Sequence, residues 1–270
     1  MLDYDSIDDW SPRLEQALTE VVPLAIRQTI AASNPEFIED AMDTLLQRAE
    51  RETVIRCTLA WICAQEVVAY HGTRLNSAEA QSIQSTGLKP LLPQQRRQRL
   101  ERALSKHRDW RADTDLLDQT IRAHSGTGKS GRREGQVHLT LSRAGLTDGF
   151  NHYLTHGSEF DQQIAHALHG QEGIDLLAAD GNPTLVTVSV PGHIALLGSH
   201  RYHTPEQMIQ RGDVPNLVRQ LLEAWSFRLA NPTYQTTRRK LDCGIWFEAA
   251  VPPEWISSVQ EWPISARPAL

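Results

Sequence analysis

The fold is decided by one segment, Val67-Val68-Ala69-Tyr70-His71-Gly72-Thr73-Arg74, in which apolar residues lead directly into polar ones. The apolar half predicts a buried strand, and the polar half then lies at the mouth of that strand. Because glycine leaves the backbone approachable there, the segment favours binding of a small polar ligand. For His71 alone, the alternative is a strand-end turn that satisfies the imidazole.

Further strands and helices follow this segment. The strand candidates are 67–71, 136–142, 184–190 and 244–251. Ser77 to Thr86 reads as a short helix that is stopped by Gly87, and Pro215 to Leu229 as an amphipathic helix.

The region before the segment is predicted to be helical. Asn34-Pro35-Glu36 has the pattern of a helix start, and apolar residues at helical spacing continue from there to about Ala64. One long helix or two abutting helices would fit. We therefore expect an α+β protein with a helical N-terminal region, 1–66, followed by a sheet domain, 67–270.

Charge divides the chain at the same place. Residues 1–66 hold 13 acidic and 5 basic side chains, whereas residues 94–134 hold 11 Lys or Arg against 6 Asp or Glu. This basic insertion is compatible with a polyanionic partner, and the alternative is an exposed helix with solvated arginines.

Other features indicate a cytoplasmic protein that does not enter a membrane. No apolar run approaches the roughly 20 residues of a membrane span, and the acidic first residues are unlike a secretory signal. The three cysteines form no C-x-x-C pair, as expected where thiols stay reduced.

The first segment, followed by Ile83-x-x-x-Gly87-Leu88, resembles the first motif of the ADP-ribosyltransferases. That superfamily includes the diphtheria-toxin and poly(ADP-ribose) polymerase group, the DarT-type enzymes that modify DNA, and the tRNA 2′-phosphotransferases. The resemblance implies an NAD site and a split β-sheet domain. In it, His71 would bond the adenosine-side ribose and Gly72 the nicotinamide carboxamide, with Tyr70, Thr73 and Arg74 beside the cofactor.

Two later segments fit the same family over roughly residues 67–260. Residues 136–142 resemble its second strand, so that Thr140 and Ser142 would line the cofactor site, and a later aromatic would stack on nicotinamide. Tyr153 is the nearest candidate for this aromatic and Phe150 the second. Residues 238–256, with a Pro-Pro-Glu turn, resemble the last strand.

The catalytic carboxylate is where the sequence departs from the family. Relatives place a glutamate near the beginning of the last strand, but here that position falls at Asp242 to Gly244. Glu248 lies further along, on a strand face with Trp246 and Ala250, and Glu159 is its rival. A carboxylate would stabilise the cationic sugar that forms as nicotinamide leaves, and could take a proton from the acceptor.

Two other kinds of site are not expected. Residues 123–130 fit a relaxed phosphate-loop pattern, but no buried strand precedes them and no helix follows. The histidine pairs lack a zinc signature, so no metal is expected.

The sequence thus predicts an NAD-dependent ADP-ribosyltransferase with His71 and Glu248 or Glu159 as catalytic residues. RNA or DNA is favoured over protein as the acceptor because of the basic insertion and the DarT-type relatives. Such an enzyme would act as a toxin, an antiphage defence component or an effector, with the acidic N-terminal region as an antitoxin or partner surface. The alternatives are an RNA 2′-phosphotransferase and an inactive, ligand-binding member of the family.

Overall fold

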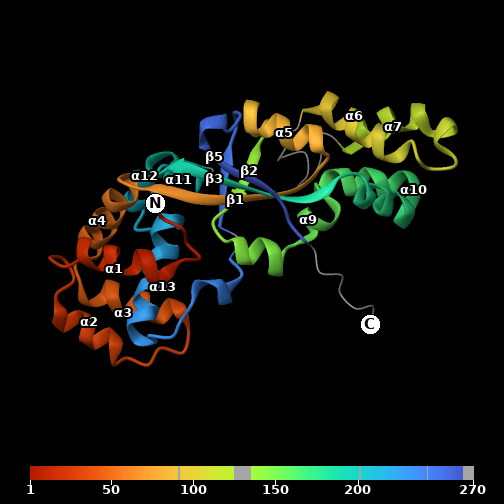
Figure 1. Ribbon diagram of the computed structural model, residues 1–270. Coiled ribbons are helices and arrows are strands. Elements are labelled where there is room, and N and C mark those ends of the chain that lie inside the picture. Colours follow the sequence, from red (N-terminus) through yellow and green to blue (C-terminus); the bar gives the residue numbers. More distant parts are fainter. Residues whose placement is uncertain (91, 125–134, 201, 242, 264–270) are drawn as a thin grey trace. The chain divides into compact units, whose positions relative to one another are not determined.

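A computed structural model describes residues 1–90, 92–124, 135–200, 202–241 and 243–263 (Figure 1). The chain combines many helices with one five-stranded sheet, so the expected α+β class is confirmed. It divides into two compact units. The first unit consists of residues 1–69, 139–145 and 189–246, and the second of 70–138, 146–188 and 247–270.

The sheet has the strand order β4-β2-β1-β3-β5. Its strands are β1 Glu66–Leu75, β2 Val137–Thr140, β3 Asn182–Pro191, β4 Gly244–Phe247 and β5 Ile256–Glu261. The central strand β1 is the segment singled out in the sequence, and it is longer than expected. β3 and β5 pair in antiparallel fashion from Thr184 opposite Glu261 to Val188 opposite Ile256, with an irregularity after Thr187.

The end of the sheet differs from the sequence-based expectation for 244–251. β4 stops at Phe247, Glu248 lies in a bend, and Val251 forms an isolated antiparallel bridge with Leu88. The prediction of one continuous strand was therefore wrong, and Glu248 does not share a strand face with Ala250. The physical reason is that the Val251 N–H and C=O groups pair with Leu88, at 2.9 and 3.0 Å between nitrogen and oxygen.

The helices of the first unit include those that form most of the N-terminal region, residues 1–66. They are α1 Ile7–Ala17, α2 Leu24–Ala31, α3 Ile38–Arg48, α4 Arg51–Cys63, α11 Gly192–Gly198, α12 Pro205–Gln210 and α13 Asn216–Ala230. Two abutting helices, α3 and α4, occupy the stretch that ends near Ala64, as one of the two readings of the sequence predicted. The expected start at Asn34 was wrong, because Asn34 adopts a left-handed φ of 43° and the Asp40 carboxylate instead accepts the Phe37 N–H at 2.9 Å.

Helices of the second unit include most of the described part of the basic insertion, in α6 and α7. They are α5 Ser77–Thr86, α6 Pro93–Leu104, α7 Trp110–His124, α9 His152–His156 and α10 Glu159–Ala179. The helices α6, α7 and α10 lie side by side around an apolar core (Figure 1). Its buried members are Leu100, Ala103, Leu104, Leu117, Ile121, Phe160, Ile164, Ala165 and Leu177. Within the described part of the chain, none of the helices is long and apolar enough to span a membrane.

Gly87 ends α5 as predicted and is the position where backbone geometry most clearly requires glycine. Its φ is 75°, and a Cβ atom there would lie 1.9 Å from the Val251 carbonyl oxygen. The end of α5 and the Pro-Pro-Glu turn can approach each other this closely only because Gly87 has no side chain.

We expect Gly87→Ala to lower the free energy of unfolding by about 2 kcal/mol or more, because a strained φ and a backbone clash add together. The midpoint of thermal unfolding should fall by roughly 4–8 °C. Gly170→Ala is the matched control, since Gly170 also has a positive φ of 58° but no atom within 4 Å of an added Cβ. Equal losses in both variants would contradict the close approach to Val251.

Candidate functional site

The second unit contains the strongest candidate, which is centred on His71 of β1. From Val67 to Leu75 every residue of this strand is buried except His71, which keeps partial exposure. The imidazole Nδ1 lies 2.8 Å from the carbonyl oxygen of His138. A carbonyl can only accept, so Nδ1 carries the proton and Nε2 presents a lone pair. Nε2 has no hydrogen-bond partner among the residues that the structure describes.

Protonation of His71 is disfavoured by its surroundings. Desolvation of the ring lowers the pKa below its ordinary value of 6.5, the hydrogen bond to His138 opposes this shift, and the positive charge of Arg99 adds to it. The residue therefore presents a neutral hydrogen-bond acceptor at neutral pH. An acceptor of this kind suits a ligand hydroxyl.

We expect the His71 imidazole to titrate below pH 6.5 when followed by NMR. Since the unfolded chain binds this proton first, the contribution of His71 to stability is intact above pH 6.5 and is lost as the pH falls towards the lower folded pKa. The free energy of unfolding, measured with urea, should therefore fall by more between about pH 7.5 and about pH 5.5 in the wild type than in His71→Asn. A loss of equal size in both proteins would show that His71 is not the group concerned.

Gly72 has a packing role in this structure. A Cβ atom there would lie 2.9 Å from Leu146 Cδ1, so the Leu146 side chain would have to shift to admit one. Leu146 belongs to the short π-helix η1, Gly145–Gly149. Tyr70 and Thr73, which the family resemblance assigns to the cofactor site, are buried beside His71 in the chain.

The two terminal nitrogens of the Arg74 guanidinium donate to backbone carbonyls, while its Nε is buried without a hydrogen-bond partner among the described residues. It donates to Leu154 and Thr155 at 3.1 Å each, and also to Gly181. Leu154 and Thr155 lie in the last turn of α9, where unpaired carbonyls favour a cation. Arg74 therefore connects β1 to α9 and acts as a positioning residue, whereas the resemblance had it lying beside the cofactor.

The helix α9 brings two predicted site residues together. Tyr153 lies next to His152, with ring centroids 4.1 Å apart, and His152 Nε2 lies 3.1 Å from the Glu159 carboxylate. Glu159 is the first residue of α10 and is exposed. Through Arg74, this corner of α9 and α10 is linked by hydrogen bonds to the strand that carries His71.

Glu248, the other candidate carboxylate, is exposed in the bend after β4. The bridge between Leu88 and Val251 joins its segment to the end of α5. Two stretches that carry the family resemblance, Ile83 to Leu88 and the Pro-Pro-Glu turn, are thus in direct contact. Asp242, at the family's usual glutamate position, lies outside the described residues, as do residues 125–134 and with them most of the phosphate-loop pattern.

Thr140 and Ser142 belong to the first unit, where both are buried. The Thr140 hydroxyl donates to the Leu241 carbonyl at 3.4 Å, and the Ser142 hydroxyl accepts the Gly145 N–H at 2.9 Å. These bonds give each side chain a role in holding local backbone. Phe150, the second aromatic candidate, is partly buried just before α9 in the second unit.

A buried charge cluster in the second unit was not anticipated. The Asp161 carboxylate is 1% exposed and lies 3.4 Å from Arg96 Nε and 3.9 Å from Arg99 Nε. Arg96 in turn stacks on Phe160, with its guanidinium carbon 3.4 Å from the ring centroid. Burial raises the pKa of Asp161, and the two arginines oppose that shift. The feature of the sequence that could have indicated this cluster is an acidic residue, Asp161, among the buried positions of α10.

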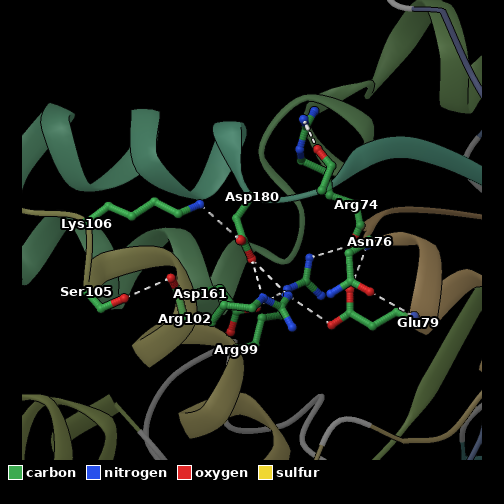
Figure 2. Close-up of polar contacts among 10 residues, drawn as sticks. Arg74, Asn76, Glu79, Arg99, Arg102, Ser105, Lys106, Asp161 and Asp180 are labelled. Atoms are coloured by element: carbon green, nitrogen blue, oxygen red, sulfur yellow. Dashed lines mark hydrogen bonds and ion pairs between the residues drawn. The ribbon is translucent and has the colours of Figure 1, made fainter.

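Other cations of α6 and of the turn that follows it are also paired within the unit, and Figure 2 shows two of them, Arg102 and Lys106. Arg102 contacts Asp180 at 2.8 Å and Glu79 at 2.9 Å, and Lys106 lies 3.4 Å from Asp180. Arg97 pairs with Glu101 and Asp118. Much of the basic character of 94–134 is therefore neutralised internally, which weakens the argument from charge for a polyanionic partner.

A pocket of about 390 Å³ lies in the first unit, and none of its lining residues is a predicted site residue. It is lined by Arg56, Leu59, Ala60, Cys63, His193, Leu196, Leu197, Pro205 and Glu206. Within the described ranges, no cluster of three His, Cys, Asp or Glu side chains is arranged to hold a metal ion.

Comparison of this chain with protein-family models, with curated proteins and with solved structures found no match. The argument for function therefore rests on the site itself.

Proposed function

We propose that this protein is an NAD-dependent ADP-ribosyltransferase whose donor site is centred on His71. The observation that carries the proposal is the neutral imidazole of His71, whose Nε2 lone pair is open at the one position between Val67 and Leu75 that is not buried. This geometry fits recognition of a ribose hydroxyl. It agrees with the role that the resemblance to ADP-ribosyltransferases gives to this histidine.

When bound, NAD supplies the ADP-ribosyl group through cleavage of its bond between ribose and nicotinamide. His71 holds a ribose hydroxyl through Nε2, and Tyr153 offers a ring on which nicotinamide can stack. A carboxylate then stabilises positive charge on the sugar and takes the proton of the incoming acceptor.

Glu159 is our preferred carboxylate and Glu248 the second. The preference rests on connectivity, since Glu159 bonds His152 beside Tyr153 and their helix is held by Arg74 of the His71 strand. Glu248 lies after the end of β4, in a bend that the sequence-based argument had not expected. The choice is open to direct test.

For the acceptor we propose a macromolecule, and RNA or DNA before protein. The remaining support for nucleic acid is the family resemblance, because several arginines of α6 are committed to carboxylates of the same unit. The acidic N-terminal helices remain the proposed surface for an antitoxin or other partner protein. A toxin, a defence enzyme and an effector would all use this chemistry.

Incubation with NAD labelled in the adenylate tests the proposal. Purified protein is mixed separately with single-stranded DNA, RNA and a protein extract, and label on each acceptor is measured together with free nicotinamide. Transfer to one acceptor class, lost in His71→Ala, supports the proposal. Release of 2′-phosphate from phosphorylated RNA would instead identify a 2′-phosphotransferase. Binding of NAD without turnover would identify an inactive binding protein.

A further inference from the structure

Positive charge exceeds negative charge around the end of β1. Five cations, Arg74, Arg96, Arg99, Arg102 and Lys106, lie in one network with three carboxylates, Asp161, Asp180 and Glu79. Figure 2 labels all of these residues except Arg96. The Asp161 carboxylate is the anion nearest to Arg96 Nε and Arg99 Nε in this network, at 3.4 and 3.9 Å. Buried charges are ordinarily paired and hydrogen-bonded, so this excess of cations favours an additional anion.

Arg99 is the member of the network best able to receive that anion. Its Nη2 donates to the Arg74 carbonyl oxygen at 2.8 Å, while its Nε is 3.9 Å from Asp161, beyond hydrogen-bond distance. Its Nη1 has no hydrogen-bond partner among the described residues, and its side chain is 15% exposed. Arg74 is engaged by carbonyls, and Arg96 is stacked on Phe160.

The surrounding backbone holds the Arg99 guanidinium in place. A Cβ atom at Gly157 would lie 3.1 Å from Arg99 Nη2, and Gly157 has a φ of 82°. The Arg74 carbonyl that accepts from Arg99 is on β1, three residues after His71. Desolvation lowers the pKa of His71, and the positive charge of Arg99 lowers it further.

We propose that Arg99 contacts the ligand of the His71 site by binding an anionic phosphate group, the diphosphate of NAD. The inference rests on the proposed function for the identity of the ligand. A guanidinium offers parallel N–H donors that match two phosphate oxygens, and α6 presents it from a fixed position. One arginine of the basic insertion would thus serve the donor NAD, and not the acceptor.

Calorimetric binding of ADP-ribose and of adenosine separates this role from a structural one. Arg99→Gln should weaken ADP-ribose binding by about ten- to a hundredfold, as for loss of a charged hydrogen bond, and leave adenosine binding unchanged. Arg99→Lys should give an intermediate loss, because it keeps the charge and loses the planar pair of donors. Arg97→Gln is the matched control on the same helix, since Arg97 pairs with Glu101 and Asp118, and should bind as the wild type does.

Several results would overturn the inference. These are unchanged ADP-ribose binding in Arg99→Gln, an equal loss for adenosine, and an equal loss in Arg97→Gln. If Arg99→Gln does not fold, Arg99→Lys decides in the same way. Binding of inorganic pyrophosphate separates the two proposals. If pyrophosphate binds in an Arg99-dependent way but NAD is not turned over, only the proposed function is contradicted. If NAD is turned over equally well without Arg99, only this inference is contradicted.

Discussion

We expect His71→Ala to lower kcat/KM for NAD consumption by about a hundredfold or more, because the variant loses the group that orients the ribose. The change removes the only partly exposed side chain of β1 between Val67 and Leu75, together with its bond to the His138 carbonyl. Nicotinamide release under initial-rate conditions measures the effect. Circular dichroism and thermal unfolding show whether the fold survives.

The control for this variant is His166→Ala, because His166 is exposed on α10 in the same unit. Its activity should match the wild type. His71→Asn is the conservative variant, whose amide can still accept from a hydroxyl, and it should retain more activity than His71→Ala. Wild-type turnover in His71→Ala would remove His71 from the site and the proposed function with it.

Glu159→Gln should lower kcat for transfer by about 10²- to 10⁴-fold, the range typical of a lost general base, with a smaller change in KM. The amide keeps the size of the side chain and the chance to bond His152, but it has no charge with which to stabilise a cationic sugar. Steady-state rates of acceptor labelling and of NAD hydrolysis measure the two steps separately.

Glu248→Gln is the matched comparison, and on our preference for Glu159 it should stay within about threefold of the wild type. The opposite ranking would assign the role to Glu248 and leave the ADP-ribosyltransferase proposal standing. Equal activity in both variants and in the double variant would contradict the need for either carboxylate. His152→Ala gives a further check, since it removes the contact beside Tyr153 and should alter KM more than kcat.

Local patterns were enough to predict the central parts of this fold. Three signals each depend on neighbours within a few residues: the apolar run before His71, the stop of α5 at Gly87, and the amphipathic spacing of α13. The same logic placed the candidate site at His71. A polar side chain within a buried strand, such as His71 in β1, must face solvent, a ligand or a hydrogen-bond partner.

Features that depend on distant pairing were not predicted. β5 was missed because Ile256–Glu261 alternates only weakly between apolar and polar residues, and its strand form comes from pairing with β3. The extent of β4 depends on a bridge from Val251 to Leu88. The arginines of α6 resembled a solvated or polyanion-binding surface until the carboxylates of Asp161 and Asp180, far along the chain, were found beside them.

The pairing of β5 with β3 has a consequence for synthesis of the chain. β3 lies between β1 and β5 in the sheet, but β5 is translated only after α11, α12 and α13. Until then, one hydrogen-bonding edge of β3 has no partner, and an open edge of this kind promotes pairing with other chains. Nascent chains stalled before Ile256 should therefore associate readily with one another, and chaperones that cover strand edges should improve the yield of the complete protein.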